Sequence, residues 1–421
     1  MNELLTGDPS ARSKELKRPA WENRVHRFFV SLATFDRLPL LLVIAWQVVD
    51  GVLLGWWADR LLHTPLSFWM VALVFLAFVS LDAVALALLP RLGLSFGPLN
   101  SVWSLLGLAR WATGALSLTL LAAFNVAGTG PYWAVFALPQ VMITAALLWS
   151  CYAEPFSLQI TRLELALPGI PPGKSIRVVH LSDIHLERLT RREEAVLQII
   201  SQADPDYIFL TGDNLNLSYI HDPDAMRQFN AWAGRLRARL GIYAVPGGPP
   251  VDSLDLARQL FRGSPVRLLE NEMVTVKHEG FDLQLAGITC QRDKDADGIA
   301  FAHVIQSARD SEPTIFLYHS PDLMPAVAAS GRVDLYLAGH THGGQICLPI
   351  YGAMFTCSDF GKRYEAGLYR QGRTSLYVSR GIGLEGLSAP RARFLSRPEV
   401  VILTLTGPTN RRANAKMLDT S

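Results

Sequence analysis

The sequence predicts an α/β domain preceded by an all-α region of about four membrane-crossing helices. The first observation is the distribution of charge: the 421 residues include 39 Lys and Arg and 37 Asp and Glu, and only six of these lie between residues 38 and 152. The second is that short β-branched runs alternate with polar helical stretches after residue 176, which is typical of α/β domains. We therefore expect a basic cytoplasmic tail at 1–37, a transmembrane region at 38–152, the α/β domain at 153–408 and a disordered tail at 409–421.

The composition excludes several classes of protein. Half of the residues are hydrophobic and the mean hydropathy is +0.21, which is too apolar for a disordered chain or an ordinary soluble one. A formal net charge of +2 argues against nucleic-acid binding. The four cysteines form no C-x-x-C pair, so we expect reduced thiols rather than a disulfide framework or a structural zinc site.

The apolar region divides into four runs, at 38–58, 66–89, 102–126 and 132–152, which are separated by breaks rich in Pro and Gly. Each run has close to the ~20 residues that a helix needs to cross a ~30 Å hydrocarbon core. Tryptophans fall near the run ends, as aromatic residues do at membrane interfaces. The sequence therefore predicts four transmembrane helices in an integral, multi-pass membrane protein, with the bilayer as one partner.

The N-terminal tail predicts the orientation in the membrane. A cleavable signal peptide fits poorly, because 37 largely polar residues precede the first apolar run and no short apolar segment ends in a small-residue cleavage site. The tail holds seven basic residues, whereas the first and third connections between runs hold only Arg60. Positive charge marks the cytoplasmic side. Four crossings return the chain to that side, so the α/β domain is also predicted to be cytoplasmic.

Three charged residues interrupt the apolar runs: Asp50, Asp82 and Arg110. A charge inside the membrane is costly unless it is paired or hydrated. One interpretation is a functional membrane site, and with it a transporter regulated by the soluble domain. The other is that the acidic residues lie near run ends or share Arg110 as a partner. No internal repeat or interrupted helix pair supports a transporter.

The α/β domain begins with a strand, a helix and a second strand, read as IRVVHLSD from residue 176, a helix at 191–202 and then DYIFLTGD. Its length is enough for one domain with a sizeable core. Further strands are predicted at 241–245, 283–288, 314–318, 335–338, 376–379 and 400–405, with helices at 252–262, 300–307 and 323–330.

Side chains of types that can bind metals follow four of these strands. Loops at the carboxyl ends of parallel strands are where open α/β sheets place their sites, so we expect these side chains to converge. A mixed set of carboxylates and imidazoles suits two divalent ions such as Mn, Fe or Zn, which together clamp a phosphoryl group and activate a water. The six residues are Asp183, His185, Asp213, His319, His340 and His342.

A G-x-G-x-x-G pattern occurs at Gly381, Gly383 and Gly386. A dinucleotide-binding fingerprint would lead from a strand into a helix. Here the glycines lead to Ser-Ala-Pro, so the sequence does not predict a dinucleotide site.

The ordered set HLSDIH, LTGD, HSPD, GHTHGGQ, LYVSRGIG and RPEV resembles the calcineurin-like metallophosphoesterases, in their membrane-associated bacterial branch. The resemblance spans roughly residues 176–405. It implies a four-layer αββα sandwich that holds two divalent metals. By motif, Asp183, His185 and His342 would bind one metal, and His319 and His340 the other. Asp213 would bridge the two metals and would be the central catalytic residue.

One motif departs from the family pattern. Where the family usually has G-N-H-D or G-N-H-E, this chain has Gly247, Gly248, Pro249 and Pro250. The family's Asn would be a metal ligand and its His would assist the leaving group, roles that Gly248 and Pro249 have no side chain to fill. Loss of a general acid costs about 10²- to 10⁴-fold in rate.

Neighbouring polar residues could substitute for the missing groups, or could be ordinary loop and capping residues. Four arginines near the C-terminus could steer an anionic substrate or lipid surface, or could form a solvated basic face. The first set comprises Asn214, Asn216, His221, Asp222 and Asp252, and the second comprises Arg380, Arg391, Arg393 and Arg397.

These observations predict a membrane-anchored, dinuclear-metal phosphoesterase that hydrolyses a phosphoester or pyrophosphate bond with a metal-activated water. Tethering to the bilayer favours a phosphorylated, lipid-linked substrate, because it raises the effective concentration of enzyme and substrate. The resemblance points the same way, towards phosphoesters of envelope lipids or of the cell wall. The alternative is a catalytically impaired domain that acts as a binding or regulatory membrane protein, and the Gly248 and Pro249 replacements motivate it.

Overall fold

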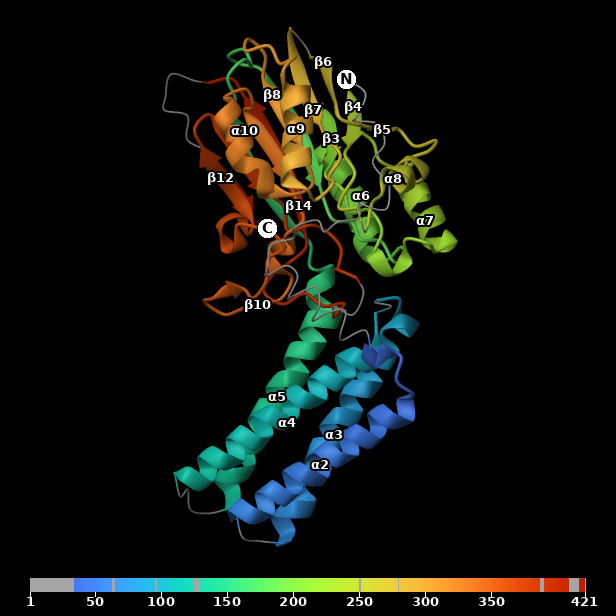
Figure 1. The fold of residues 1–421 in the computed structure, drawn as a ribbon, viewed down its shortest axis with the longest axis vertical. Coiled ribbons are helices and arrows are strands. Elements are labelled where there is room, and N and C mark those ends of the chain that lie inside the picture. Colours follow the sequence, from blue (N-terminus) through green and yellow to red (C-terminus); the bar gives the residue numbers. More distant parts are fainter. Residues whose placement is uncertain are drawn as a thin grey trace, which may run out of the picture.

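The computed structural model describes residues 34–62, 65–94, 97–124, 129–249, 251–278, 280–386, 390–408 and 416–420. An elongated bundle of helices joins one end of a compact α/β domain (Figure 1). Nearly all of the basic tail predicted at 1–37 lies outside the described residues, as does Pro250. The four cysteines are free, as expected from their spacing.

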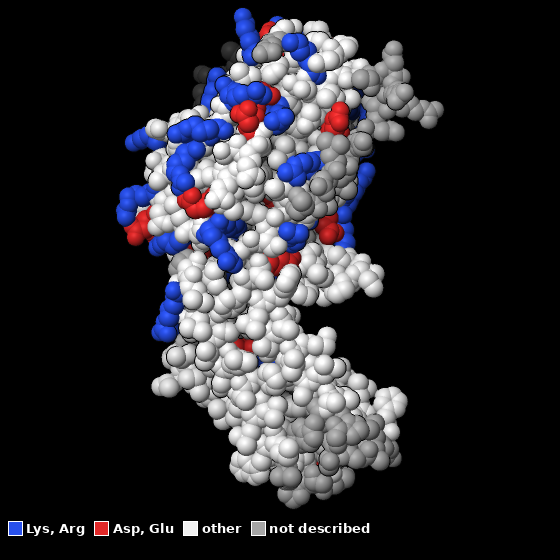
Figure 2. Space-filling view, turned by 180° about the vertical axis from the view of Figure 1, so that it is seen from behind, with Lys and Arg blue, Asp and Glu red and all other residues white. Residues whose placement is uncertain are grey.

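Four helices form the bundle: α2 (Leu40–Leu62), α3 (Pro65–Leu88), α4 (Leu99–Ala123) and α5 (Thr129–Leu148). Four spans in the described chain are long and apolar enough to cross a membrane, which agrees with the predicted number. Their outward residues are apolar, with Leu41 78% and Trp69 65% exposed. In Figure 2 the Lys and Arg residues gather over the α/β domain, and the helical part is almost uncharged. Such a surface is suited to contact with the hydrocarbon core of a bilayer.

Two of the three charged residues that interrupt the predicted apolar runs pair with one another. The guanidinium of Arg110 donates to Asp82 at 2.6 and 2.7 Å, and both side chains are fully buried. Arg110 also donates to the Gln140 carbonyl and the Thr144 hydroxyl, each at 2.7 Å. This network joins α3, α4 and α5, so the interpretation in which Asp82 shares Arg110 as a partner is confirmed.

A seven-stranded sheet forms the first half of the α/β domain, in the order β15-β1-β14-β2-β3-β4-β5. Strands β2 to β5 are parallel, β14 runs antiparallel to β2, and β1 runs parallel to β14. The bounds are β1 Gln159–Ala166, β2 Ser175–Leu181, β3 Tyr207–Leu210, β4 Gly241–Ala244, β5 Val266–Leu268, β14 Glu399–Thr406 and β15 Lys416–Thr420.

A six-stranded sheet forms the second half, in the order β12-β13-β9-β8-β7-β6. Its four central strands are parallel and its two edge strands are antiparallel to their neighbours. The bounds are β6 Glu272–His278, β7 Phe281–Gly287, β8 Thr314–Leu317, β9 Leu335–Ala338, β12 Gly367–Gln371 and β13 Thr374–Val378, and a separate hairpin joins β10 (Cys347–Leu348) to β11 (Gly352–Ala353).

The two sheets pack face to face and helices cover their outer faces. Buried apolar residues of both sheets, such as Phe209 and Leu317, form the core between them. Helices α6 (Arg191–Ala203), α7 (Pro223–Ala233) and α8 (Leu254–Leu260) pack on the seven-stranded sheet. Helices α9 (Lys294–Ile305) and α10 (Met324–Ser330) pack on the other sheet. These are the four αββα layers expected from the resemblance (Figure 1).

The structure contains elements that the sequence analysis did not predict: β1, β5, β6, β10, β11, β12, β15 and α7. Helix α7 has clear local signals, because Asp222 caps it with bonds to two backbone nitrogens and Pro223 follows at its first position. Residues 416–420 form β15, antiparallel to β1, where a disordered tail was expected. The physical reason is that β1 would otherwise leave its outer edge of backbone groups unpaired.

Candidate metal centre

The six predicted site residues lie on loops that follow β2, β3, β8 and β9, so both sheets contribute. Five of the six have positive φ: Asp183 (48°), His185 (41°), Asp213 (53°), His340 (72°) and His342 (52°). Residues other than glycine rarely adopt this left-handed conformation, and clusters of it occur at functional sites. These sharp turns gather the side chains where the two sheets meet. All six residues are buried.

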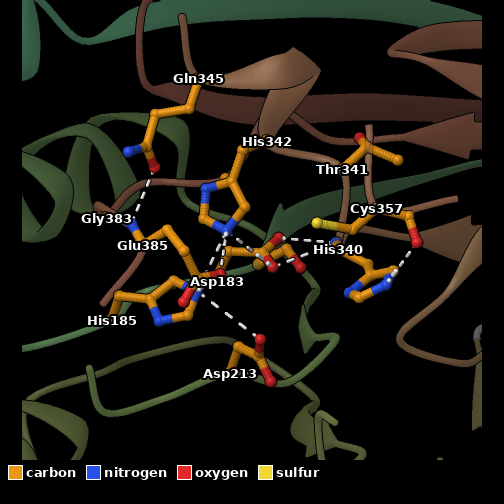
Figure 3. Close-up of polar contacts among 12 residues, drawn as sticks. Asp183, His185, Asp213, His340, Thr341, His342, Gln345, Cys357, Gly383 and Glu385 are labelled. Atoms are coloured by element: carbon orange, nitrogen blue, oxygen red, sulfur yellow. Dashed lines mark hydrogen bonds and ion pairs between the residues drawn. The ribbon is translucent and has the colours of Figure 1, made fainter. Parts of the chain in front are cut away.

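The side chains form two groups, and within each group the candidate ligand atoms all lie within 4.8 Å of one another. In the first group, Nε2 of His342 lies 3.0 Å from Nε2 of His185 and 3.6 Å from Oδ1 of Asp183 (Figure 3). In the second group, Nε2 of His319 lies 3.1 Å from Nδ1 of His340 and 3.3 Å from Oδ2 of Asp213.

Asp213 faces both groups. Its Oδ2 atom lies 3.3 Å from Nε2 of His319 and 3.6 Å from Nε2 of His185. Atoms that coordinate one ion at about 2.0 to 2.2 Å lie roughly 3 to 3.5 Å apart, so the two groups have the spacing of two neighbouring coordination shells. A single carboxylate placed between two such shells can bridge two ions.

The hydrogen bonds of His319 and His340 leave one nitrogen of each ring able to bind a metal. Nδ1 of His319 lies 2.8 Å from the Thr211 carbonyl, and Nε2 of His340 lies 3.0 Å from the Cys357 carbonyl. A carbonyl accepts a hydrogen bond, so each of these nitrogens carries the proton and the opposite nitrogen keeps its lone pair. That opposite nitrogen is the one that points into the second group.

The charges in the second group are strongly coupled. Burial lowers the pKa of His319, but the carboxylate of Asp213 beside it more than offsets this effect and raises the pKa to about 9. Burial raises the pKa of Asp213, whereas the neighbouring histidines, His319 first, bring it below its usual range. Asp213 is therefore a carboxylate. His319 would have to lose this proton to hold a metal ion, because imidazole ligates in its neutral form.

The loop that lacks the family's Asn and His contacts Asp213 through its backbone. The backbone nitrogen of Gly248 donates to Oδ1 of Asp213 at 2.8 Å. A Cβ atom at Gly247 would lie 2.0 Å from the same oxygen, so only glycine fits there. Gly248 is buried, whereas Pro249 is exposed. The loop therefore orients one oxygen of Asp213 with a main-chain N–H.

Four of the candidate substitutes have other partners. Asp252 accepts bonds from the backbone and side-chain nitrogens of Asn214 at 3.1 and 2.6 Å. Burial, followed by the charge of Asp213, raises the pKa of Asp252 to about 7. Asn216 donates to Glu187 at 3.1 Å, and Asp222 caps α7. Asp222 is therefore a capping residue, and His221 is exposed.

The four arginines bind the polypeptide itself. Arg391 pairs with Glu187 at 2.5 Å, and Arg393, which is fully buried, donates to the Gly383 carbonyl at 2.7 Å. Arg380 pairs with Glu399, and Arg397 donates to the Ser157 carbonyl. The interpretation as a solvated basic face was wrong for Arg391 and Arg393, because both side chains are buried and bonded to the polypeptide.

The structure brings one residue to the site that the sequence analysis missed. Oε2 of Glu385 lies 3.9 Å from Nε2 of His342 and 4.0 Å from Nε2 of His185 (Figure 3). Its other oxygen accepts a bond from the Gly386 backbone, and its own backbone nitrogen donates to Gln345 at 2.7 Å. With its side chain 36% exposed, Glu385 stands at the open side of the first group.

The G-x-G-x-x-G pattern, which contains Glu385, explains how this segment reaches the site. A Cβ at Gly381 would lie 2.6 Å from Asp183, and one at Gly383 would lie 2.7 Å from His185. These glycines allow the backbone to approach the site residues closely. An acidic residue inside a glycine-rich segment directly after a strand was the available signal.

The comparisons with known proteins agree with this geometry. A model of the calcineurin-like phosphoesterases matches residues 176–344. The uncharacterized metallophosphoesterase YkuE of Bacillus subtilis is 30% identical over 263 residues, which cover 60% of this chain and 87% of YkuE. The phosphodiesterase YaeI of Escherichia coli is 29% identical, over 60% of this chain and 90% of YaeI.

A bovine relative is named as a transmembrane protein. It is the transmembrane protein with metallophosphoesterase domain of Bos taurus, which is 29% identical over 266 residues, or 58% of this chain and 56% of the bovine protein. This chain therefore matches little more than half of the bovine protein's length. With the αββα layers, the two ligand groups and YkuE matched over most of its length, the chain belongs to the calcineurin-like metallophosphoesterase family.

Proposed function

We propose that this protein is a membrane-anchored phosphoesterase that uses two divalent metals to hydrolyse a phosphoester or pyrophosphate bond. The observation that supports this proposal most strongly is the position of Asp213, whose Oδ2 atom faces a histidine of each group at 3.3 and 3.6 Å. We assign the first metal to Asp183, His185 and His342 and the second to His319 and His340, with Asp213 shared. Mn, Fe or Zn suits this ligand set.

When bound, the two ions supply Lewis-acid stabilisation of phosphoryl oxygens and a water of lowered pKa. The chain's own groups set the geometry for this chemistry. The Thr211 and Cys357 carbonyls orient His319 and His340, and the Gly248 N–H holds Oδ1 of Asp213 so that Oδ2 points between the groups. Glu385, at the open side of the first group, provides a seventh carboxylate or imidazole group for an ion or its bound water.

The proposed reaction proceeds without the family's usual histidine acid. Pro249 occupies its place and has neither a proton to donate nor a side chain directed into the site. The absence of that histidine costs about 10²- to 10⁴-fold with a poor leaving group and little with a good one. The site therefore favours substrates with good leaving groups, such as pyrophosphates and activated diesters.

The membrane region supports a lipid-linked substrate. Four candidate spans adjoin the domain that carries the site, and the bovine relative is named as a transmembrane protein. A substrate held in the same bilayer meets the site at high effective concentration. The positive charge of the N-terminal tail and an even number of crossings favour a cytoplasmic position for the catalytic domain.

The test is hydrolysis by the full-length protein in detergent with Mn²⁺, using a soluble diester, a soluble monoester and a lipid pyrophosphate. Asp213→Asn removes the shared charge, and Asp255→Asn is its matched control, because the Asp255 side chain is 85% exposed. We expect hydrolysis by the parent and Asp255→Asn proteins and none by Asp213→Asn. Equal rates for all three proteins would exclude the proposed role of the site.

A second candidate function is a binding or regulatory protein that retains metals without turnover. The observation that favours it is the pair Gly248 and Pro249, which removes one ligand side chain and the usual acid. It predicts metal binding with no hydrolysis of any of the three substrates. In that case Gly248→Asn combined with Pro249→His should restore hydrolysis, whereas under the leading proposal the parent protein is already active.

A further inference from the structure

A cavity of about 520 Å³ lies where the membrane helices meet the catalytic domain. The helices contribute the end of α3, the first half of α4 and the end of α5, with residues such as Leu86, Leu106 and Ala146. The domain contributes Ile346, Met354 and the segment 390–394. The volume falls within the ~300 to 1,000 Å³ of ligand-binding pockets.

The residues that line this cavity are suited to binding a hydrocarbon chain. Of the described residues that line it, Arg391 alone is charged, and its guanidinium is already paired with Glu187. Small residues such as Gly97, Ala109 and Ala146 provide the space between larger aliphatic neighbours. A polar ligand would lose its hydration here without compensating bonds, whereas an alkyl or isoprenoid chain would be favoured by burial.

The cavity and the metal centre share a wall. Ile346, which lines the cavity, follows His342 by four residues and forms a β-bridge with Phe394, another lining residue. Gln345 joins the two sides directly, because its side-chain nitrogen donates to the Pro390 carbonyl at 3.2 Å and its oxygen accepts from the Glu385 backbone at 2.7 Å. A molecule in the cavity therefore lies beside the segment that carries Glu385 and His342.

The protein surface around the cavity is apolar, as at a contact with a lipid bilayer. The β10–β11 hairpin, at the end of the domain that faces the helices (Figure 1), exposes Leu348 (46%), Ile350 (110%) and Tyr351 (60%). Contiguous exposed apolar side chains mark contact surfaces. The lining residues of α3, α4 and α5 continue the apolar faces of candidate membrane spans. With these helices in a bilayer, the cavity would adjoin apolar helix faces that contact lipid.

We propose that the cavity binds the hydrocarbon chain of a membrane lipid whose phosphoester lies at the metal centre. This inference rests on the proposed function and adds the place where the substrate's apolar part is held. We choose a lipid as the occupant because three walls of the cavity belong to membrane helices and the lining is uncharged apart from a paired arginine. The fourth wall is formed by segments of the domain that lie next to the metal centre.

Photo-crosslinking tests the proposal without relying on turnover. The probe is phosphatidic acid with a diazirine midway along one acyl chain, added to the full-length protein in nanodiscs, and labelled peptides are identified by mass spectrometry. Ala146→Phe fills the cavity from α5. Ala145→Phe is the matched control, because Ala145 is the preceding residue on the same helix, is exposed and does not line the cavity. Gel filtration verifies that both variants fold.

We expect labelling of the domain segments around Ile346 and Phe394, which bulk lipid contacts poorly. We expect this labelling to fall roughly tenfold in Ala146→Phe, equivalent to about 1.4 kcal/mol of affinity, and to persist in Ala145→Phe. Labelling confined to the outer helix faces, or unchanged by Ala146→Phe, would overturn the proposal.

Hydrolysis of bis(4-nitrophenyl) phosphate separates this inference from the proposed function. Labelling that depends on Ala146, in a protein that hydrolyses neither lipid nor soluble ester, would support the lipid site and contradict the enzyme. Hydrolysis of the soluble ester with no such labelling would support the enzyme and overturn the lipid site. Under both proposals, Ala146→Phe loses hydrolysis of the lipid, whereas Ala145→Phe retains hydrolysis of both the lipid and the soluble ester.

Discussion

The backbone nitrogen of Gly248 donates a hydrogen bond to Oδ1 of Asp213 at 2.8 Å. In the loop where the family resemblance leads us to expect an Asn ligand and a His acid, the main chain therefore contacts the shared carboxylate directly. The loop keeps a role in orienting Asp213 although it has lost both side chains. This contact requires a close approach of the two backbones.

Gly247→Ala is expected to abolish metal binding at the second group. The added Cβ would lie 2.0 Å from Oδ1 and 2.3 Å from the backbone nitrogen of Asp213, so the loop or the carboxylate must move. Gly298→Ala is the control, because a Cβ there meets nothing within 4 Å. Metal content per chain is the measurement, and an unchanged value in Gly247→Ala would show that the loop is free to move away.

Glu385→Gln is expected to weaken metal binding at the first group. The change keeps the size of the side chain but removes the negative charge that stands 3.9 Å from His342 and 4.0 Å from His185. We expect the affinity for Mn²⁺, measured by isothermal titration calorimetry, to fall about 10- to 100-fold, as on loss of a supporting partner at a metal site. Glu272→Gln, with a side chain of similar exposure (37%), should bind like the parent protein. Equal affinities for both variants would place Glu385 outside the metal centre.

Removal of either partner of the Asp82–Arg110 pair is expected to destabilise the helical bundle. Each single change, Asp82→Leu or Arg110→Met, leaves a fully buried charge without its partner, at a cost of about 3 to 5 kcal/mol. The double variant should be more stable than either single variant, because no charge remains unpaired. The free energy of unfolding in detergent measures this. Arg258→Met, in a pair with Glu270 that is 49% and 34% exposed, should change the free energy of unfolding far less than either buried variant.

Acid should destabilise the catalytic domain partly through His180. This side chain is fully buried, with Nε2 2.9 Å from the Thr211 hydroxyl, and burial lowers its pKa to about 3. Below about pH 6.5 the unfolded chain takes up a proton that the folded chain does not, so folding stability is complete above pH 6.5 and falls as the pH falls towards 3.

From pH 6.5 to 4.5 the loss attributable to His180 is on the order of 2 kcal/mol. His180→Gln should therefore show a flatter dependence of its thermal midpoint on pH than the parent protein. His221→Gln, at an exposed position, is the control and should follow the parent. Parallel pH profiles for His180→Gln and the parent would contradict the assignment.

Much of the fold and of the site could be predicted because the signals are local. Asp183 and Asp213 directly follow apolar strands, and the carboxyl ends of parallel strands meet at one edge, so the sequence was enough to group them. The four apolar runs likewise correspond to four helices of membrane-spanning length. The edge strands β6 and β12 were missed because only one neighbour pairs with each of them, and their sequences are less apolar.

Glu385 was missed for a different reason. Its approach to His342 depends on the close contacts at Gly381 and Gly383 and on the bond from its backbone to Gln345, and all of these arise from packing between distant segments. The burial of Arg391 has the same origin, since its partner Glu187 comes from a loop that lies far away in sequence. The spacing of residues along the sequence does not indicate these contacts.

The central claim is that Asp213 joins two metal ions in a working phosphoesterase. The most direct measurement is the divalent metal content of the purified full-length protein, by mass spectrometry, together with its rate on a soluble diester. We predict two ions per chain and hydrolysis in the parent and Asp255→Asn proteins, and fewer than two ions with no hydrolysis in Asp213→Asn. Two ions and an undiminished rate in Asp213→Asn, or fewer than two ions in an active parent protein, would contradict it.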